Sequence, residues 1–439
     1  MSSTLEKPRP AAGSEKSSHP LRVFRNPNFR LYFSGQLISQ VGTWMQQVAL
    51  SWLAYKLTGS PFMLAVVGVS GQLPSLVAMP FAGVFVDRLN RHKILVATSV
   101  LAMAEAAILT VLVLSHMIQV WHLVVLGIAS GLITAFDMPT RTAFVVELTG
   151  DRDDLPTSLA MNAALMNITR LFGPALAGFI VAAAGEGICF LINAVSYIAV
   201  IAALIAIKGD FAPKADKQAK VLDELKSGFK YTFETPPIRA LIVLQAAFGL
   251  GGMAYAMLMP VFVKQIGGNA NTLGYLMAAS ALGSLAGSAA LASRKSVLGL
   301  GRWVVVASFC FSMALIAFSF THALIPAMMA LSVIGAMMML QMGSAGTIIQ
   351  SIVEEDKRGR VMSLFTMAFL GTAPIGSLIA GALADRFGFQ HTILGCGIYC
   401  LLVAIAFVTQ LPRLRRESKP IYIQRGLLNA EEEVDLLTS

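Results

Sequence analysis

The stretch GVFVDRLNRHK, residues 83–93, interrupts a chain that is otherwise largely apolar. It gathers basic residues and one acid between two long hydrophobic runs. A short basic turn between such runs is typical of a loop at one face of a membrane, with Asp87 at the end of a membrane helix. We therefore expect this stretch to join two membrane-spanning helices.

Composition supports a membrane protein. Of 439 residues, 56% are hydrophobic and 13% are charged, whereas about a quarter of a typical soluble protein is charged. A hydrocarbon core about 30 Å thick needs roughly 20 apolar residues per helix. Polar residues, Gly and Pro divide the chain into such segments, which are residues 30–55, 62–86, 94–115, 120–141, 156–183, 188–207, 239–263, 272–293, 303–321, 324–349, 361–384 and 390–411. The sequence thus predicts an all-α integral membrane protein with twelve transmembrane helices.

The basic residues predict the orientation of these helices. All but four of the 33 Lys and Arg residues fall on one side of the twelve-span arrangement. The exceptions are Lys56, Lys264 and Arg386 on the other side and Arg170 inside a span. The positive-inside rule places the basic side, and with it both chain termini, in the cytoplasm. The net charge of +9 then reflects topology and attraction to anionic lipid, and no nucleic-acid partner is predicted.

The spans fall into two groups of six. We expect a disordered cytoplasmic arm over residues 1–20, a first bundle over 21–207 and a second over 239–411. The linker, 208–238, has apolar residues near helical spacing and predicts a short amphipathic helix. Residues 412–439 are expected to form a cytoplasmic tail. Two six-helix halves with the substrate path between them are a common architecture of secondary transporters.

The charged turn also carries a family resemblance. The major facilitator superfamily has the pattern G-x-x-x-D-R-x-G-R-R/K between its second and third helices, and the chain resembles it at Gly83, Asp87, Arg88 and Arg91. Asn90 replaces the second glycine of that pattern, and Asn also tolerates a left-handed turn. The resemblance implies the twelve-helix fold of that superfamily.

Two further stretches narrow the resemblance. RNPNFRL at residues 25–31 and DMPTR at residues 137–141 are similar to a bacterial exporter branch that includes enterobactin exporters. The resemblance covers nearly the whole chain and implies transport across the inner membrane, without fixing the substrate.

The motif residues are candidates for a cytoplasmic gate. Asp87 and Arg91 are four residues apart and would pair on a continuing helix, and Asp87 would also face the positive end of span eleven near Arg360. In the resembling family such a contact latches the halves in the outward-facing state. Asp137 and Arg141 have the same spacing and would extend the network. The alternative is that these charges only mark helix ends and enforce topology. The predicted gating residues are Gly83, Asp87, Arg88, Arg91, Asp137 and Arg141.

Two charges lie deeper in the predicted spans. Arg170 is near the middle of span five and Glu105 near the middle of span three, where a lone charge costs roughly 2.5–3.5 kcal/mol on insertion scales. Arg170 is predicted to bind an anionic substrate or to hold a proton-carrying carboxylate. Glu105 is the candidate proton-coupling site. The alternative for both is a structural role, with Asn162 and Asn167 satisfying Arg170.

A polar and aromatic stripe on span one indicates a face toward the central cavity. It comprises Gln36, Gln40, Trp44, Gln47 and Ser51, at intervals of three or four residues. We predict Gln40, Trp44 and Arg170 as substrate contacts, the alternative being hydrogen bonding within one bundle.

Span five carries a second structural signal. Gly173-Pro174 predicts a helix kink. Ala373-Pro374 repeats it in span eleven. The fuller glycine pattern of antiporters in the resembling superfamily is only partly matched here, and this match favours export.

Signatures of enzymes are missing from the sequence. It has no metal-ligand spacing of His and Glu, no P-loop and no G-x-S-x-G elbow, so we predict no enzyme activity, no cofactor and no metal. Without a nucleotide-binding loop, transport must draw on an ion gradient, and protons are the predicted coupling ion.

Taken together, the sequence predicts a monomeric secondary transporter of the bacterial inner membrane. It is expected to work by alternating access and to export a small amphipathic solute, siderophore-like or drug-like. The alternatives are an importer or lipid flippase on the same fold, or a membrane sensor or assembly partner without transport.

Overall fold

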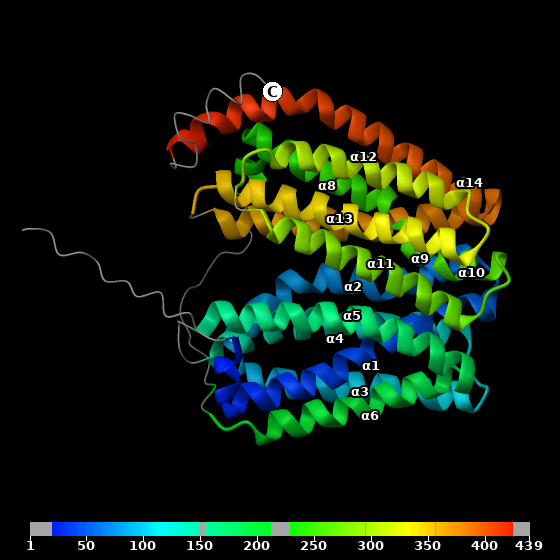
Figure 1. The fold of residues 1–439 in the computed structure, drawn as a ribbon. Coiled ribbons are helices and arrows are strands. Elements are labelled where there is room, and N and C mark those ends of the chain that lie inside the picture. Colours follow the sequence, from blue (N-terminus) through cyan, green and yellow to red (C-terminus); the bar gives the residue numbers. More distant parts are fainter. Residues whose placement is uncertain are drawn as a thin grey trace, which may run out of the picture.

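The computed structural model describes residues 20–149, 154–209, 211, 229–294, 296–355 and 357–424. Every regular element in these ranges is a helix. The long helices lie side by side in two bundles, with α1 to α6 in one and α8 to α14 in the other (Figure 1). The predicted linker helix falls mainly on residues outside the described ranges, although residues 229–234 are helical.

The first bundle follows the predicted spans closely. Asn26 and Ser60 cap α1 and α2 by accepting backbone N–H groups through their side chains. Asn90 does the same for α3 with a φ of −67°, so it serves as a helix cap and not as the expected left-handed turn residue. The elements are η1 (Pro20–Arg25), α1 (Pro27–Thr58), α2 (Pro61–Arg88), α3 (Arg91–Leu114), α4 (Val120–Thr149), α5 (Leu155–Ala184) and α6 (Glu186–Ala206).

The second bundle departs from the predicted spans in two places. Span seven, expected as one helix, is divided into three pieces. Glycines at positions 249, 251 and 252 favour an interruption near Met253, and Pro260 lacks the N–H that would continue the ladder. The elements are α8 (Pro236–Gly252), α9 (Ala254–Met257), α10 (Met259–Gln265), α11 (Ala270–Ala292), α12 (Leu300–Ser319), α13 (Leu324–Ile352) and α14 (Arg358–Gln424).

The second departure is in α14, which makes two membrane crossings. Gly388 has a φ of 83° and a ψ of 162°, a left-handed conformation that favours glycine. It separates a first arm (residues 358–387) from a second arm (residues 389–424). The second arm stays helical to Gln424, beyond the expected start of a tail at residue 412. Gly185, between α5 and α6, has nearly the same angles, 84° and 170°, so the two bundles repeat one turn at corresponding places.

The described residues contain twelve crossings, as predicted. Ten described helices are long and apolar enough to span a membrane. The polar stripe of α1 keeps it outside those ten, although at 32 residues it is long enough to cross. α14 is counted once among them but crosses twice. Both ends of the described chain lie on one side (Figure 1), which we call the termini side, and the other is the opposite side.

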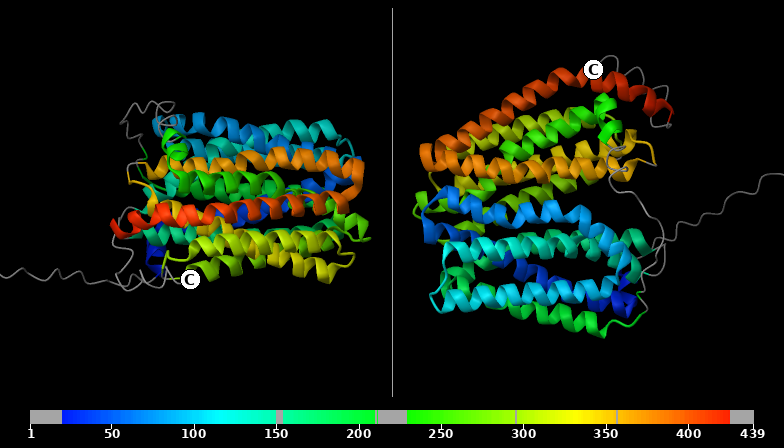
Figure 2. Two further views of the ribbon diagram at one scale, coloured as in Figure 1. Left: turned by 90° about the horizontal axis from the view of Figure 1, so that it is seen from above. Right: turned by 180° about the vertical axis from the view of Figure 1, so that it is seen from behind.

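The bundles meet mainly through two helix pairs, α5 with α11 and α2 with the first arm of α14. Figure 2 shows the paired bundles from two further directions. Near the opposite side the second pair is tight, because a Cβ atom added at Gly381 would lie 2.8 Å from the Ala65 Cβ. Midway along the pair, a Cβ atom added at Gly371 would lie 3.4 Å from the Leu76 Cδ2 atom. Near the termini side, no described atom lies within 4 Å of a Cβ added at Gly83 or Gly359.

The pair α5 and α11 is also tight near the opposite side. A Cβ atom added at Gly178 would lie 2.7 Å from the Ala270 carbonyl oxygen. The two bundles are therefore closed against each other at the opposite side, and α2 separates from the first arm of α14 toward the termini side.

Candidate functional site

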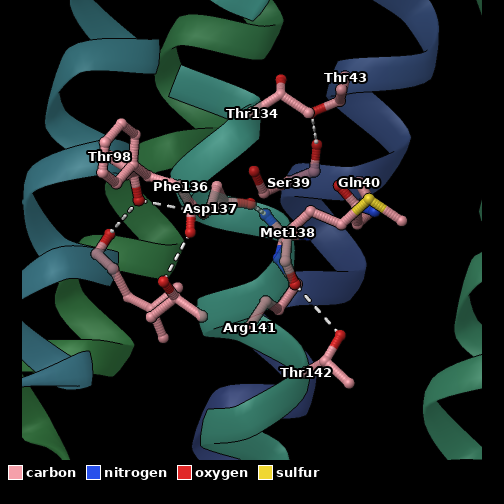
Figure 3. Close-up of polar contacts among 12 residues, drawn as sticks. Ser39, Gln40, Thr43, Thr98, Thr134, Phe136, Asp137, Met138, Arg141 and Thr142 are labelled. Carbon is pink, nitrogen blue, oxygen red and sulfur yellow. Dashed lines mark hydrogen bonds and ion pairs between the residues drawn. The ribbon is translucent and has the colours of Figure 1, made fainter. Parts of the chain in front are cut away.

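Asp137 and Arg141 form the predicted pair on α4. The Arg141 guanidinium contacts Asp137 Oδ2, and Asp137 Oδ1 accepts a hydrogen bond of 3.0 Å from Thr98 on α3 (Figure 3). The hydroxyls of Tyr32 on α1 and Tyr197 on α6 lie within electrostatic range of the guanidinium. The Thr98 hydrogen bond joins α3 to α4, and the two tyrosines bring α1 and α6 near the pair. The pair thus organises the interior of the first bundle, because Thr98, Tyr32 and Tyr197 all belong to it.

The motif turn has a different geometry from the one expected. α2 ends at Arg88 and α3 begins at Arg91, so no continuous helix carries Asp87 and Arg91. Leu89 is extended, with a φ of −107°. The Asp87 side chain lies outside the described part of the structure, and its contact with span eleven stays a prediction.

Arg91 forms an ion pair with Glu147 near the end of α4. Sequence reasoning missed Glu147, because the partners come from different helices and no spacing rule relates them. The basic turn is therefore fixed to α4 as well as to α2 and α3.

Glu105 sits in a buried chain of side chains. Gln46 on α1 donates a 2.8 Å hydrogen bond to Glu105 Oε2, and Asn193 on α6 donates one of 2.7 Å to Gln46 Oε1. The exposed fractions of Glu105, Gln46 and Asn193 are 7%, 9% and 1%. Ser196 continues the chain by donating to Asn193 Oδ1 at 3.2 Å. A carboxyl group inside the first bundle is thus connected to α1 and α6.

Gln46 was also missed from the sequence. It lies one position before Gln47, which follows the stripe of span one, and the structure exposes Gln47 and buries Gln46. The available signal was that Gln46 is polar but lies outside the stripe. That signal predicts a partner on another helix only once α3 is known to lie beside α1.

The three predicted substrate residues lie along the contact between α1 and α5. Gln40 Nε2 is 2.9 Å from the Met166 sulfur, and the Trp44 Cβ packs directly against Gly173. Met166 and Gly173 are one turn before and after Arg170, so they share its face of α5. The structure therefore brings an amide, an indole and a guanidinium to one seam.

Arg170 has an unusual environment for a charge in a membrane helix. It is half-buried, and no carboxylate of the described residues pairs with it. Asn167, proposed as its structural partner, instead donates to Ala163 in its own helix. Pro174, one turn further along α5, lies against Gly274 of α11, so Arg170 is on the side of α5 that faces the second bundle.

Pro174 adds a further polar group at this point. Proline has no backbone N–H, so the Arg170 carbonyl lacks its usual helix donor. α5 nevertheless runs unbroken from Leu155 to Ala184, and the bend expected at Gly173-Pro174 stays a prediction. In chemical terms the seam offers a cation, an aromatic face and hydrogen-bonding groups, which suit an amphipathic solute with negative charge.

Two other features bear on the site. In the part of the chain that the structure describes, no group of His, Cys, Asp and Glu side chains is placed to hold a metal ion. A mainly apolar pocket of about 600 Å³ lies away from the seam, between α8 and the two arms of α14, and is lined by residues including Gly376, Leu383, Phe387, His391 and Tyr399.

Comparison with known proteins places this geometry in context. The chain matches the family described as transmembrane secretion effector over residues 18–430. The staphyloferrin A transporter of Staphylococcus aureus is 25% identical, covering 88% of this chain and 98% of that protein. The multidrug efflux pump Tap of Mycolicibacterium fortuitum is also 25% identical, with coverages of 90% and 99%. Macrolide efflux protein A of Streptococcus pyogenes is 23% identical, with coverages of 90% and 99%.

Solved structures show the same fold. A bacterial homologue of the human lysosomal transporter Spinster, in an inward-facing and unoccupied conformation, has a TM-score of 0.69 at 12% identity, covering 88% of this chain and 98% of that one. The nucleoside transporter NupG has a TM-score of 0.68 at 13% identity, with coverages of 88% and 99%. At these identities the likeness is one of fold. The family match and the relatives above confirm the predicted superfamily and its exporter branch.

Proposed function

Because the chain belongs to the transmembrane secretion effector family of the major facilitator superfamily, we propose that this multi-pass transporter exports a small amphipathic anion in exchange for protons. Its family and relatives are membrane transporters and not enzymes. Relatives named as efflux pumps and as a siderophore transporter support the direction and the class of solute. The distribution of Lys and Arg supports a bacterial inner-membrane location with both termini in the cytoplasm.

The observation that carries this proposal is Arg170. An arginine inside a membrane helix is costly unless it meets a partner or a wet cavity. Arg170 is on the side of α5 that faces the other bundle, and no carboxylate of the described residues pairs with it. A solute with a carboxylate or catecholate would supply the missing negative charge, and Trp44 and Gln40 would contact its aromatic and polar parts. A siderophore-like anion fits this set better than a lipophilic cation, which Arg170 would repel.

Transport would proceed by alternating access. The closed opposite side and the separation at Gly83 and Gly359 support a state open on the termini side, which the proposed topology places in the cytoplasm. Rocking of the bundles would bring the motif turn, with Asp87, Arg88 and Arg91, against the start of α14 and close the cytoplasmic side. Asp137 and Arg141 would keep the first bundle rigid during this movement.

Proton coupling is assigned to Glu105 in this proposal. Its carboxyl group is buried and bonded to Gln46, so gain of a proton would change an acceptor into a donor and require the Gln46 and Asn193 amides to rearrange. Gln46 and the substrate residues Gln40 and Trp44 share α1. Protonation could therefore alter the helix that contacts the solute. The transporter is proposed to act as a monomer.

The test is flux in inverted vesicles containing the purified protein. A proton gradient is applied, and a catecholate siderophore and a lipophilic cation are offered in parallel. We expect gradient-dependent accumulation of the siderophore, its loss in Arg170→Ala and partial retention in Arg170→Lys. Arg239→Ala is the matched control, because this arginine lies at the start of α8 and donates to the Phe233 carbonyl.

Other outcomes would redirect the assignment. Accumulation of the cation alone would replace the anion with a drug-like substrate. No accumulation of either by folded protein would favour an importer, a lipid flippase or a non-transporting sensor.

A further inference from the structure

The motif of residues 83–90 has a second copy in the chain. The sequence GALADRFG, residues 381–388, has the form G-x-x-x-D-R-x-G and ends the first arm of α14 on the opposite side. The first copy ends α2 on the termini side. α2 and the first arm of α14 contact each other and run antiparallel, because Gly381 lies beside Ala65 and Gly371 beside Leu76. The second copy therefore lies at the N-terminus of α2, and the first copy lies on the side where α14 begins.

The second copy is engaged with the other bundle. Asp385 Oδ2 accepts a 2.8 Å hydrogen bond from Ser60 Oγ and one of 3.2 Å from the Phe62 backbone N–H. Ser60 is the N-cap residue of α2 and Phe62 lies in its first turn. The carboxylate therefore occupies the positive end of α2, where backbone N–H groups have no partner within the helix. The Tyr55 hydroxyl on α1 is also within its electrostatic range.

Gly381 makes this contact sterically feasible. A Cβ atom at that position would lie 2.8 Å from the Ala65 Cβ and 3.0 Å from the Pro61 carbonyl oxygen. Any larger residue would push the first arm of α14 away from α2. The glycine and the aspartate of the motif thus have separate tasks, one allowing close approach and the other binding the helix end.

The first copy shows the complementary state. Around Gly83 no described atom comes within 4 Å of an added Cβ, and the same holds for Gly359 at the start of α14. The glycines of the two copies therefore have different surroundings. Gly381 on the opposite side is packed against α2, whereas Gly83 on the termini side is open.

We propose that Asp385 and Gly381 form an extracytoplasmic latch that holds the opposite side closed. Opening that side breaks the Asp385 bonds to Ser60 and Phe62, and the cytoplasmic copy of the motif then closes at the other end of the same helix pair. Each engaged latch favours one of the two conformations of the transporter. This proposal rests on alternating access in the proposed function, but on neither its substrate nor its coupling ion.

The test measures conformation directly, without substrate. Hydrogen–deuterium exchange of the full-length protein in lipid nanodiscs is compared for the parent and Asp385→Ala. We expect faster exchange in residues 57–66 and 262–272 at the opposite side and slower exchange in 86–94 and 358–362 at the termini side. Hydrogen bonds to charged groups are strong enough for their loss to change the ratio of the two conformations about tenfold.

Controls separate a latch from a local effect. Arg386→Ala alters the neighbouring residue, whose described ring contact is with Phe387 in its own helix, and should leave exchange at both sides unchanged. Gly381→Ala should act as a wedge and shift exchange in the same sense as Asp385→Ala. Gly395→Ala is its matched control, since no described atom lies within 4 Å of the added Cβ. Asp385→Asn keeps an acceptor oxygen and should fall between parent and Asp385→Ala.

The reciprocal change is decisive. Faster exchange confined to residues 57–66, with no protection gained at the termini side, would show that Asp385 only stabilises the start of α2 and would overturn the latch. An equal shift in Arg386→Ala would also overturn it. If Asp385→Ala does not fold, Asp385→Asn and Gly381→Ala decide the question by the same readout. A reciprocal shift in a protein that moves neither test solute would leave the latch standing and refute the proposed substrate.

Discussion

The buried carboxyl of Glu105 gives the sharpest test of proton coupling. Two substitutions separate its chemistry from its structural role. Glu105→Gln keeps an oxygen that can accept the hydrogen bond from Gln46 but cannot change its charge. Glu105→Ala removes the acceptor as well, leaving the Gln46 nitrogen buried without its partner.

The structure sets the size of each effect. An unsatisfied buried donor costs about 1–3 kcal/mol, and a cooperative unit the size of the first bundle changes its melting temperature by about 2–4 °C per kcal/mol. Glu105→Ala is therefore expected to lower the melting temperature by about 2–12 °C. Glu105→Gln retains the hydrogen bond and should stay within about 4 °C of the parent.

The functional assay compares driven and downhill flux in the same vesicles. We expect Glu105→Gln to lose accumulation driven by the proton gradient, because the side chain no longer carries a proton, while downhill movement of the solute continues. Gradient-driven accumulation at the parent level in Glu105→Gln would refute the coupling role. A melting temperature lowered as far as in Glu105→Ala would instead show that the network requires the carboxyl itself.

Three further outcomes follow from the described contacts. Arg170→Ala should weaken binding of an anionic solute about tenfold or more, as loss of one charge-assisted contact implies, measured by equilibrium binding to the purified protein; unchanged affinity would return Arg170 to a structural role. Asp137→Ala leaves the half-buried Arg141 without its ion pair and should destabilise the fold by about 3–5 kcal/mol, while Asp137→Ala combined with Arg141→Met should recover part of that loss in a thermal-shift assay. Gly178→Leu places a side chain where the Ala270 carbonyl is 2.7 Å from an added Cβ, so it should open the opposite side and raise hydrogen exchange at residues 262–272. Unchanged exchange there would contradict the close packing of α5 against α11.

The features predicted best from sequence are those governed by the bilayer alone. Segment length comes directly from the thickness of the hydrocarbon core, which is why twelve crossings could be counted. The pairing of Asp137 with Arg141 was also predictable, because residues four apart on a helix are neighbours. Both inferences need no knowledge of which helices touch.

Contacts between helices were not predictable in this way. Arg91 with Glu147 and Gln46 with Glu105 join residues that no local spacing relates. The interruption of span seven depends on how a Gly-rich segment and Pro260 pack against other helices, and the continuation of α14 to Gln424 shows that helix ends need not coincide with the end of an apolar run. The second motif copy was visible in the sequence, but its role becomes evident only when α2 and α14 are seen to run antiparallel.

The helix α1 connects the separate parts of the proposed mechanism. Within a few turns it carries Gln40 and Trp44 at the substrate seam, Gln46 in the Glu105 network, and Trp52, whose ring centre lies 5.2 Å from the Lys264 Nζ of α10 in the other bundle. A helix transmits displacement along its axis because its backbone hydrogen bonds run in that direction. A change in the hydrogen bonds of Gln46 would therefore act in both directions along α1. It would reach the solute contacts at Gln40 and Trp44, and it would reach the contact of Trp52 with Lys264 at the opposite side. Coupling between proton, solute and gate then requires only that one helix changes its position, and Glu105→Gln should weaken the response of hydrogen exchange at residues 262–272 to pH.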